Sequence, residues 1–193
     1  ASSDQAKTWQ VSNDAAGLEA LVSQVSTMAP ALTVLEATGG YEFEAAEASF
    51  EMLIRKQLGQ FNPSFTLLEY HSTHRFHGGE HGFETCEATV KIEIGGERVY
   101  TVAEGDGPVN ALDNALRKAL ITSYPAIQTM RLVDYKVRII DSGSGTAAKT
   151  RVLITSTDGN ATWSTVGCSF NIIDASWKAL VDGIEYFLSK QPA

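Results

Sequence analysis

The sequence predicts an α+β domain in which two similar strand–strand–strand–helix units follow one another. An alternating strand pattern and an apolar helix pattern support the elements of each unit, and an internal repeat shows that the two units are similar. Val90, Ile92 and Ile94 alternate with Lys91 and Glu93, which is typical of a strand with one wet face. A strongly apolar helix pattern follows each group of strands. Segregated strands and helices of this kind favour helices packed on antiparallel sheet.

The internal repeat has a nearly constant spacing. Leu-Leu-Glu-Tyr at 67–70 recurs as Leu-Val-Asp-Tyr at 132–135, and residues 95–102 recur at 158–165. We also pair the loop at 105–108 with the loop at 167–170, because each precedes an apolar helix. A sustained period of this size indicates one supersecondary unit used twice. The sequence therefore predicts two βββα units within residues 61–193.

The elements of the two units follow from local patterns. Gly95-Gly96 predicts a hairpin turn, followed by a returning strand at 99–103. The first helix has an apolar stripe made of Leu112, Ala115, Leu116, Ala119 and Leu120. In the second unit, strands are expected around 137–140, 152–154 and 163–166, with a glycine loop at 141–146. The second helix has one face made of Ile173, Trp177, Leu180, Ile184 and Phe187.

A linker helix is expected before the two units, within residues 42–60. It should run from about 43 to 58, because Gly59 and Pro63 end it. Glu51 and Arg55 form a favourable i, i+4 pair. The expected apolar face consists of Phe43, Ala46, Phe50, Leu53, Ile54 and Leu58. Residues 1–41 contribute one short helix and one short strand, too little to bury a core, so they are not expected to form an independent domain.

Composition excludes several classes of function. The chain has 193 residues and a formal net charge of −8. Phosphate binding needs clustered Lys and Arg, and no basic run is present, so no nucleic-acid partner is expected. No apolar run is long enough to span a membrane, and no signal peptide is expected at the start, so we expect a cytoplasmic protein. The two cysteines, Cys86 and Cys168, are expected to be buried, unpaired thiols.

The loop that opens the first unit's helix is the main candidate site. It consists of Gly105, Asp106, Gly107, Pro108, Val109 and Asn110. Free amides at a helix start favour an anion such as a carboxylate, while Val109 and Leu112 would contact an apolar side chain. Spacing alone favours an ordinary strand-to-helix turn. The repeat adds a second loop that would share the pocket, with Gly167, Cys168, Ser169 and Asn171.

Several long segments carry a family resemblance: residues 41–51, 105–120, 130–139, 141–151 and 167–186. They are similar to the C-terminal linker and regulatory domain of bacterial citramalate synthase, which is related to that of 2-isopropylmalate synthase. The resemblance implies a dimerising domain of two βββα units. It further implies that a branched-chain amino acid, the end product, binds between subunits and causes feedback inhibition. Isoleucine is the effector of citramalate synthase and leucine that of isopropylmalate synthase.

The same resemblance implies that the residues named above in the two loops bind the effector. In the family, catalysis belongs to an N-terminal barrel that uses a divalent metal and acetyl-CoA. A barrel of this type needs about 250 residues, and only 42 precede Phe43. We therefore expect no catalytic residue, no metal site and no cofactor in this chain, and no activity from it alone.

Residues 8–41 resemble a different family, the front part of IS110-type transposases. The match rests on segments 11–21 and 29–41, in which Glu36 corresponds to a metal-binding carboxylate. A two-metal site needs several converging oxygen ligands, and the family's other carboxylates are missing, so this segment should be catalytically inactive. The chain thus resembles a chimera. A structural dimerisation module without effector binding, and a remnant of a DNA-processing protein, are the alternative functions.

All four histidines fall in one stretch, as His71, His74, His77 and His81. With Cys86 nearby, they could bind zinc or nickel. A strand over 70–77 would place His71 and His77 on one face and His74 on the other. A polar strand followed by a variable loop is therefore favoured over a metal site.

Overall fold

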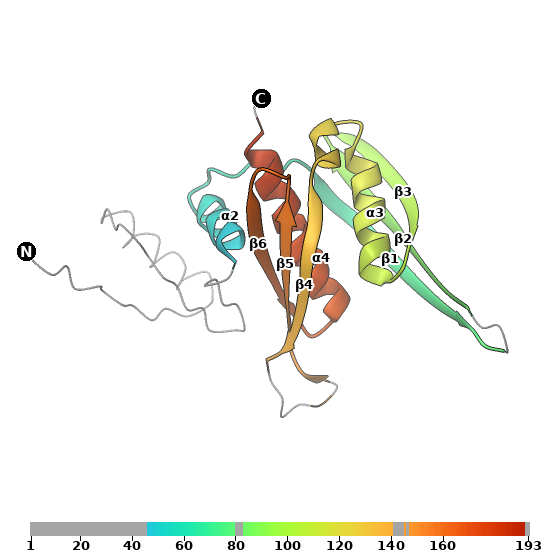
Figure 1. Cartoon of the computed structure of the whole chain (residues 1–193). Helices are drawn as coiled ribbons and strands as arrows, with labels where there is room; N and C mark the ends of the chain where they lie inside the picture. The colour runs from blue at the N-terminus through green and yellow to red at the C-terminus, as the bar shows by residue number, and fades with distance from the viewer. Residues whose placement is uncertain (1–45, 80–82, 141–144, 146, 192–193) are drawn as a thin grey trace, which may run out of the picture.

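The computed structural model describes residues 46–79, 83–140, 145 and 147–191, and it consists of two three-stranded sheets with helices packed on them (Figure 1). Helix α2 (Glu47–Gln57) comes first. The predicted fragment at 1–41, with Glu36, lies outside the described residues, as does most of the loop at 141–146. The two βββα units predicted from the sequence are confirmed, and so is the α+β class.

The first unit is an antiparallel meander followed by a helix. Strands β1 (Thr66–His77), β2 (Phe83–Ile94) and β3 (Glu97–Gly105) lie in that order in the sheet, and α3 (Pro108–Leu120) follows. Gly95 and Gly96 form the β2–β3 turn with φ values of 58° and 87°. These backbone angles are disfavoured for residues with a side chain, which explains the glycine pair.

The second unit repeats the arrangement. A short 3-10 helix, η1 (Pro125–Gln128), leads into β4 (Arg131–Ile139), β5 (Thr150–Thr157) and β6 (Thr162–Ser169), and α4 (Ile172–Ser189) follows. The sheet order is again the chain order. The register of the first strand shifts between Leu67 and Glu69 in one unit and between Leu132 and Asp134 in the other. This shared irregularity confirms that the two units are structural repeats.

Equivalent hydrogen bonds fix the spacing of the repeat. Thr101 Oγ1 donates to the carbonyl of Ala115 at 2.7 Å, and Thr165 Oγ1 donates to that of Ala179 at 2.8 Å. Each residue of the second hydrogen bond lies 64 positions after its equivalent in the first. The same spacing aligns Gly105 with Ser169, not with Gly167 as the sequence suggested. The predicted pairing of the two glycine loops was therefore displaced by two residues, because Gly105 is the last residue of β3 whereas β6 continues past Gly167 to Ser169.

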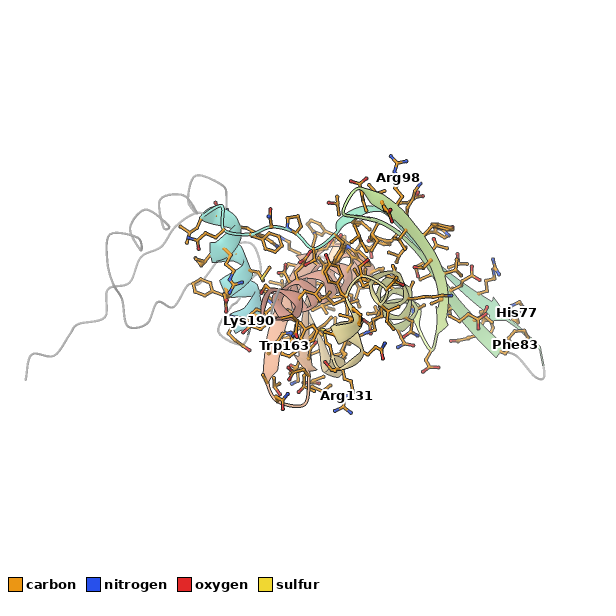
Figure 2. The ribbon with its side chains drawn as sticks, turned by 90° about the horizontal axis from the view of Figure 1, so that it is seen from above. His77, Phe83, Arg98, Arg131, Trp163 and Lys190 are labelled. Carbon is orange, nitrogen blue, oxygen red and sulfur yellow. The ribbon has the colours of Figure 1, made fainter. Side chains whose placement is uncertain are left out.

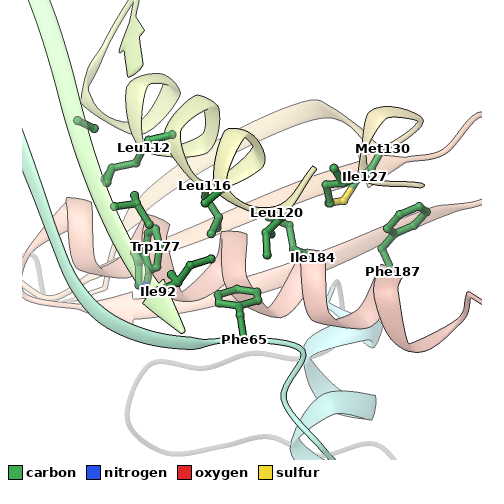
Figure 3. Close-up of a cluster of buried hydrophobic side chains, with 14 of the residues drawn as sticks. Phe65, Ile92, Leu112, Leu116, Leu120, Ile127, Met130, Trp177, Ile184 and Phe187 are labelled. Carbon is green, nitrogen blue, oxygen red and sulfur yellow. The ribbon is translucent and has the colours of Figure 1, made fainter. Parts of the chain in front are cut away.

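One hydrophobic core joins the two units (Figure 3). Helix α3 packs on β2 and β3, and α4 packs on β5 and β6. The predicted stripe of α3 is confirmed as fully buried or nearly so. Trp177, Ile184 and Phe187 of α4 belong to the same cluster as α3 and the first sheet. Trp177 also stacks on Tyr70 of β1, with ring centroids 5.0 Å apart.

Helix α2 differs from the prediction in its bounds and in its buried face. It begins at Glu47, and Phe43 lies outside the described residues. The side chains it buries are those of Ala48, Ser49 and Met52, whereas Phe50, Leu53 and Ile54 are partly exposed. This face points inward because α2 packs against the edge of β6, where Glu47 and Ser49 bind strand amides. The expected Glu51–Arg55 ion pair is present.

Candidate functional site

The start of α3 is free of side-chain caps. Gly107 is the N-cap residue with extended backbone, no side chain caps the helix by hydrogen bonding, and the first turn has no acidic residue. Just before it, the amide of Asp106 donates to Asn110 Oδ1 at 3.1 Å, which fixes the loop. The positive end of the helix dipole is therefore not compensated by a side chain of the helix itself.

The start of α4 is built differently. Asn171 Oδ1 accepts from the amide of Ile173 at 2.8 Å, and Ser169 Oγ accepts from the amide of Asn171 at 3.2 Å. Asp174 adds a negative charge in the first turn and pairs with Lys178 at 2.7 Å. Burial raises the pKa of Asp174, but hydrogen bonds from Lys178 and Ser169 outweigh it and leave the pKa below its usual value. This helix start is thus already capped and charged.

A groove of about 700 Å³ lies between α3 and β4. Most of its lining is apolar, and it begins beside the uncapped end of α3. Val109 and Asn110 are the predicted site residues that line it. The complete lining consists of Val109, Asn110, Asp113, Arg117, Ile121, Ile127, Gln128, Met130, Arg131, Leu132 and Tyr135.

A buried ion pair fixes one wall of this groove. Asp113, which is almost fully buried, accepts from Arg117 Nε at 2.9 Å. Arg117 Nη1 also donates to the carbonyl of Met130 at 2.7 Å and to that of Ile127 at 3.3 Å. The pair therefore ties the segment before β4 to α3. Its charges are satisfied within the protein, so this pair is structural and sets the width of the groove.

Three predicted contacts are not available to a ligand in the groove. Leu112, which was expected to contact a ligand, is fully buried in the core and does not line the groove. Gly167 and Cys168 are also buried. Cys168 clusters with Ala46 and Val166 on the α2 side of β6, and burial raises the pKa of its thiol.

Two glycines of the predicted loops are required by close packing. A Cβ on Gly105 would lie 2.4 Å from the amide nitrogen of Ala111, and one on Gly167 would lie 2.0 Å from the carbonyl oxygen of Ala175. Both distances are far shorter than a normal contact. A Cβ on Gly107 would meet nothing within 4 Å. Gly105 and Gly167 thus allow helix and strand to approach each other, while Gly107 leaves open space at the helix start.

The histidine-rich stretch is an exposed part of β1. His71, His74 and His77 are all exposed, and His74 lies 3.4 Å from Glu84. No group of three His, Cys, Asp or Glu side chains that could hold a metal occurs among the described residues, and His81 lies outside them. Cys86 and Cys168 are both buried and are not joined in a disulfide, as predicted.

Sequence reasoning missed the far wall of the groove. Tyr135 of β4 contributes to it, across the groove from Arg117 of α3, and Tyr135 donates to or accepts from Ser176 Oγ at 2.8 Å. The i, i+4 spacing of Asp113 and Arg117 on an otherwise apolar helix face was a usable signal. No local pattern places β4 opposite α3, because that arrangement depends on how the two units pack.

The fold and the groove define a duplicated α+β domain, whose two βββα units share one core. The family model described as LeuA allosteric (dimerisation) domain matches residues 44–188, and the chain belongs to this family. No helix in the described ranges is long and apolar enough to cross a membrane.

Curated relatives include two named (R)-citramalate synthase. The one from Synechocystis sp. is 50% identical over 151 residues, which cover 77% of this chain and 28% of the relative. That from Geobacter sulfurreducens is 48% identical over 151 residues, which cover 78% of this chain and 28% of the relative. A 2-isopropylmalate synthase from Shewanella piezotolerans is 35% identical over 102 residues, covering 50% and 17%. The chain thus matches little more than a quarter of the length of the two citramalate synthases and less than a fifth of that of the 2-isopropylmalate synthase.

Proposed function

We propose that this chain is the regulatory domain of a citramalate synthase-like enzyme of branched-chain amino-acid biosynthesis. It binds the end product, isoleucine or leucine, acts in feedback inhibition and assembles as a homodimer. Membership of an allosteric domain family and identity near 50% with citramalate synthases support this proposal. We assign no catalytic step to the described residues.

The uncapped start of α3 beside an apolar groove carries the proposal. An amino-acid carboxylate would accept from the free amides of the first turn, at Val109 and Asn110. The exposed carboxylate of Asp106 lies at the same end and would attract the ammonium group. A branched side chain would then lie against Val109, Leu132 and Tyr135. This arrangement revises the predicted site, because the loop before α4 contributes no free helix start.

The experiment is calorimetric titration of the full chain with isoleucine, leucine and valine, with lysine as a control ligand. The variant Gly107→Asn copies the cap that Asn171 provides in the second unit. Its side-chain oxygen would occupy an amide needed by the ligand, so we expect affinity to fall about tenfold or more. The stability of the fold should change by only about a few tenths of a kcal/mol.

Lys118→Ala is the matched control, since Lys118 is exposed near the other end of the same helix. It should leave the affinity unchanged. Absence of heat with all three branched-chain amino acids would refute effector binding. A dimer that gives no heat would instead support the alternative of a structural dimerisation module.

A further inference from the structure

Strand β1 is an outer strand of the first sheet, and its unpaired edge is long. It pairs with β2 alone. Its 12 residues, Thr66–His77, include no proline and no lysine, two residues that commonly protect an exposed edge. In the part of the chain that the structure describes, the backbone of β1 hydrogen-bonds only to β2. The far end of the strand, at His77, extends beyond the rest of the molecule together with Phe83 of β2 (Figure 2).

Two other outer strands have edges that helices cover. On β3, the carbonyl of Val102 accepts from Lys118 of α3 at 3.1 Å. The carbonyl of Glu104 accepts from Asn114 of the same helix at 2.9 Å. On β6, two strand amides donate to side chains of α2 at 2.9 Å each. The described residues give β1 no such cover, so its edge is available for pairing with another strand.

The order of residues along β1 makes the strand complementary to a reversed copy of itself. Glu69 and Arg75 lie at equal distances on either side of Ser72. An antiparallel strand turned about Ser72 therefore places Glu69 of each copy opposite Arg75 of the other. Opposite charges in directly paired positions stabilise a sheet. The same register brings Leu68 opposite Phe76, with exposures of 42% and 70%, at both ends of the paired stretch.

The charges needed for this pairing are accessible. Glu69 and Arg75 are both exposed, and they lie on the same face of the strand because an even number of residues separates them. Within the described residues, no ion pair uses either of these charges. His71 would lie opposite Thr73 of the other copy, and these two side chains already hydrogen-bond at 2.9 Å within one chain.

We propose that a second copy of this chain pairs with β1 edge to edge, antiparallel across a two-fold axis at Ser72. The two three-stranded sheets then form one continuous sheet, and both copies keep their helices on the same face of it. A two-fold contact must be self-complementary, and the arrangement of β1 about Ser72 therefore favours a second copy over an unrelated strand.

This contact goes beyond the proposed function and does not depend on it. No residue of β1 lines the groove between α3 and β4, so the pairing leaves the groove lining unchanged within each chain. Copies that associate through another surface would be joined further by this edge.

The test is disulfide cross-linking of the full chain. Ser72→Cys would place a thiol on the two-fold axis. The background is Cys86→Ala, because Cys86 lies on the same face of the sheet, opposite His74. Directly opposite Cα atoms of antiparallel strands lie about 4.5–5.5 Å apart, which is within the range that a disulfide spans. With oxidised glutathione, we expect a covalent dimer on a non-reducing gel.

Glu69→Cys in the same background is the matched control. Its two copies would lie six residues apart along the paired strands, about 20 Å, which is too far for a disulfide. It should give little covalent dimer, whereas Glu69→Cys/Arg75→Cys should give it readily. Circular dichroism verifies that each variant is folded. No dimer from Ser72→Cys, or equal yields from Ser72→Cys and Glu69→Cys, would refute the pairing.

A charge exchange tests the register. Glu69→Arg and Arg75→Glu, each combined with Ser72→Cys, should slow cross-linking about tenfold, because like charges then lie opposite each other twice. Glu69→Arg/Arg75→Glu together should restore most of the rate. A rate that the single charge variants leave unchanged would refute this register. Effector binding is decided separately by the calorimetric titration, so either proposal can fail while the other stands.

Discussion

Glu185 shows how one buried carboxylate fixes the segment that enters the first sheet. Its two oxygens accept from the amide of Ser64 at 3.0 and 3.1 Å, and one accepts from Ser64 Oγ at 2.7 Å. Tyr124 donates to the carbonyl of the same serine at 2.8 Å. Burial raises the pKa of Glu185 above its usual 4.5, although the hydrogen bonds from Ser64 oppose this shift. The folded state therefore binds this proton more tightly than the unfolded state.

This raised pKa predicts a pH dependence of stability. The contribution of Glu185 is fully present below pH 4.5 and is lost as pH rises through the raised pKa. Relative to Glu185→Gln, which does not titrate, the wild type should lose free energy of unfolding over that window. Urea unfolding at a series of pH values measures the difference. A difference between the wild type and Glu185→Gln that stays flat over these pH values would contradict the assignment.

At the scale of elements, α2 replaces a neighbouring strand at the edge of β6. Ser49 Oγ accepts from the amide of Val166 at 2.9 Å and donates to Asp182 Oδ2 at 3.0 Å. Because Ser49 is almost fully buried, its loss leaves the strand amide without a partner.

We expect Ser49→Ala to lower the free energy of unfolding by about 1–3 kcal/mol. The amide of Val166 should also exchange its hydrogen faster, because its acceptor is gone. Glu47→Ala is the comparison, since Glu47 accepts from the more exposed amide of Ser164 at 2.9 Å. Glu47→Ala should therefore lower the free energy of unfolding by less than Ser49→Ala does. Equal losses for both variants would show that edge capping by Ser49 has no special role.

The elements differ in how far the sequence could predict them. The stripe of α3 was readable because its buried side chains follow the helical period without interruption. The buried face of α2 was not, because Ala48 and Ser49 face inward only when β6, more than a hundred residues later, lies beside them. Val109 and Asn110 were found from local loop chemistry, whereas Tyr135 joins the groove through the packing of one unit on the other.

At the scale of the whole molecule, the shared core predicts that both units unfold together. Leu116 of α3 is fully buried in the cluster that also contains Trp163 and Trp177. Leu116→Ala should lower stability by about 2–5 kcal/mol. The denaturation midpoints from tryptophan fluorescence and circular dichroism should shift by the same amount. A fluorescence midpoint that stays at the wild-type value would mean that the second unit unfolds on its own.

The packing of α2 on β6 has a consequence for the order of synthesis. Ser49 is made 117 residues before the strand residue that it binds. At 5–20 residues per second, the ribosome takes about 6–23 s to cover this distance. During that interval α2 has no strand edge to bind. The N-terminal helix of the described fold is therefore among the last elements to reach its final position.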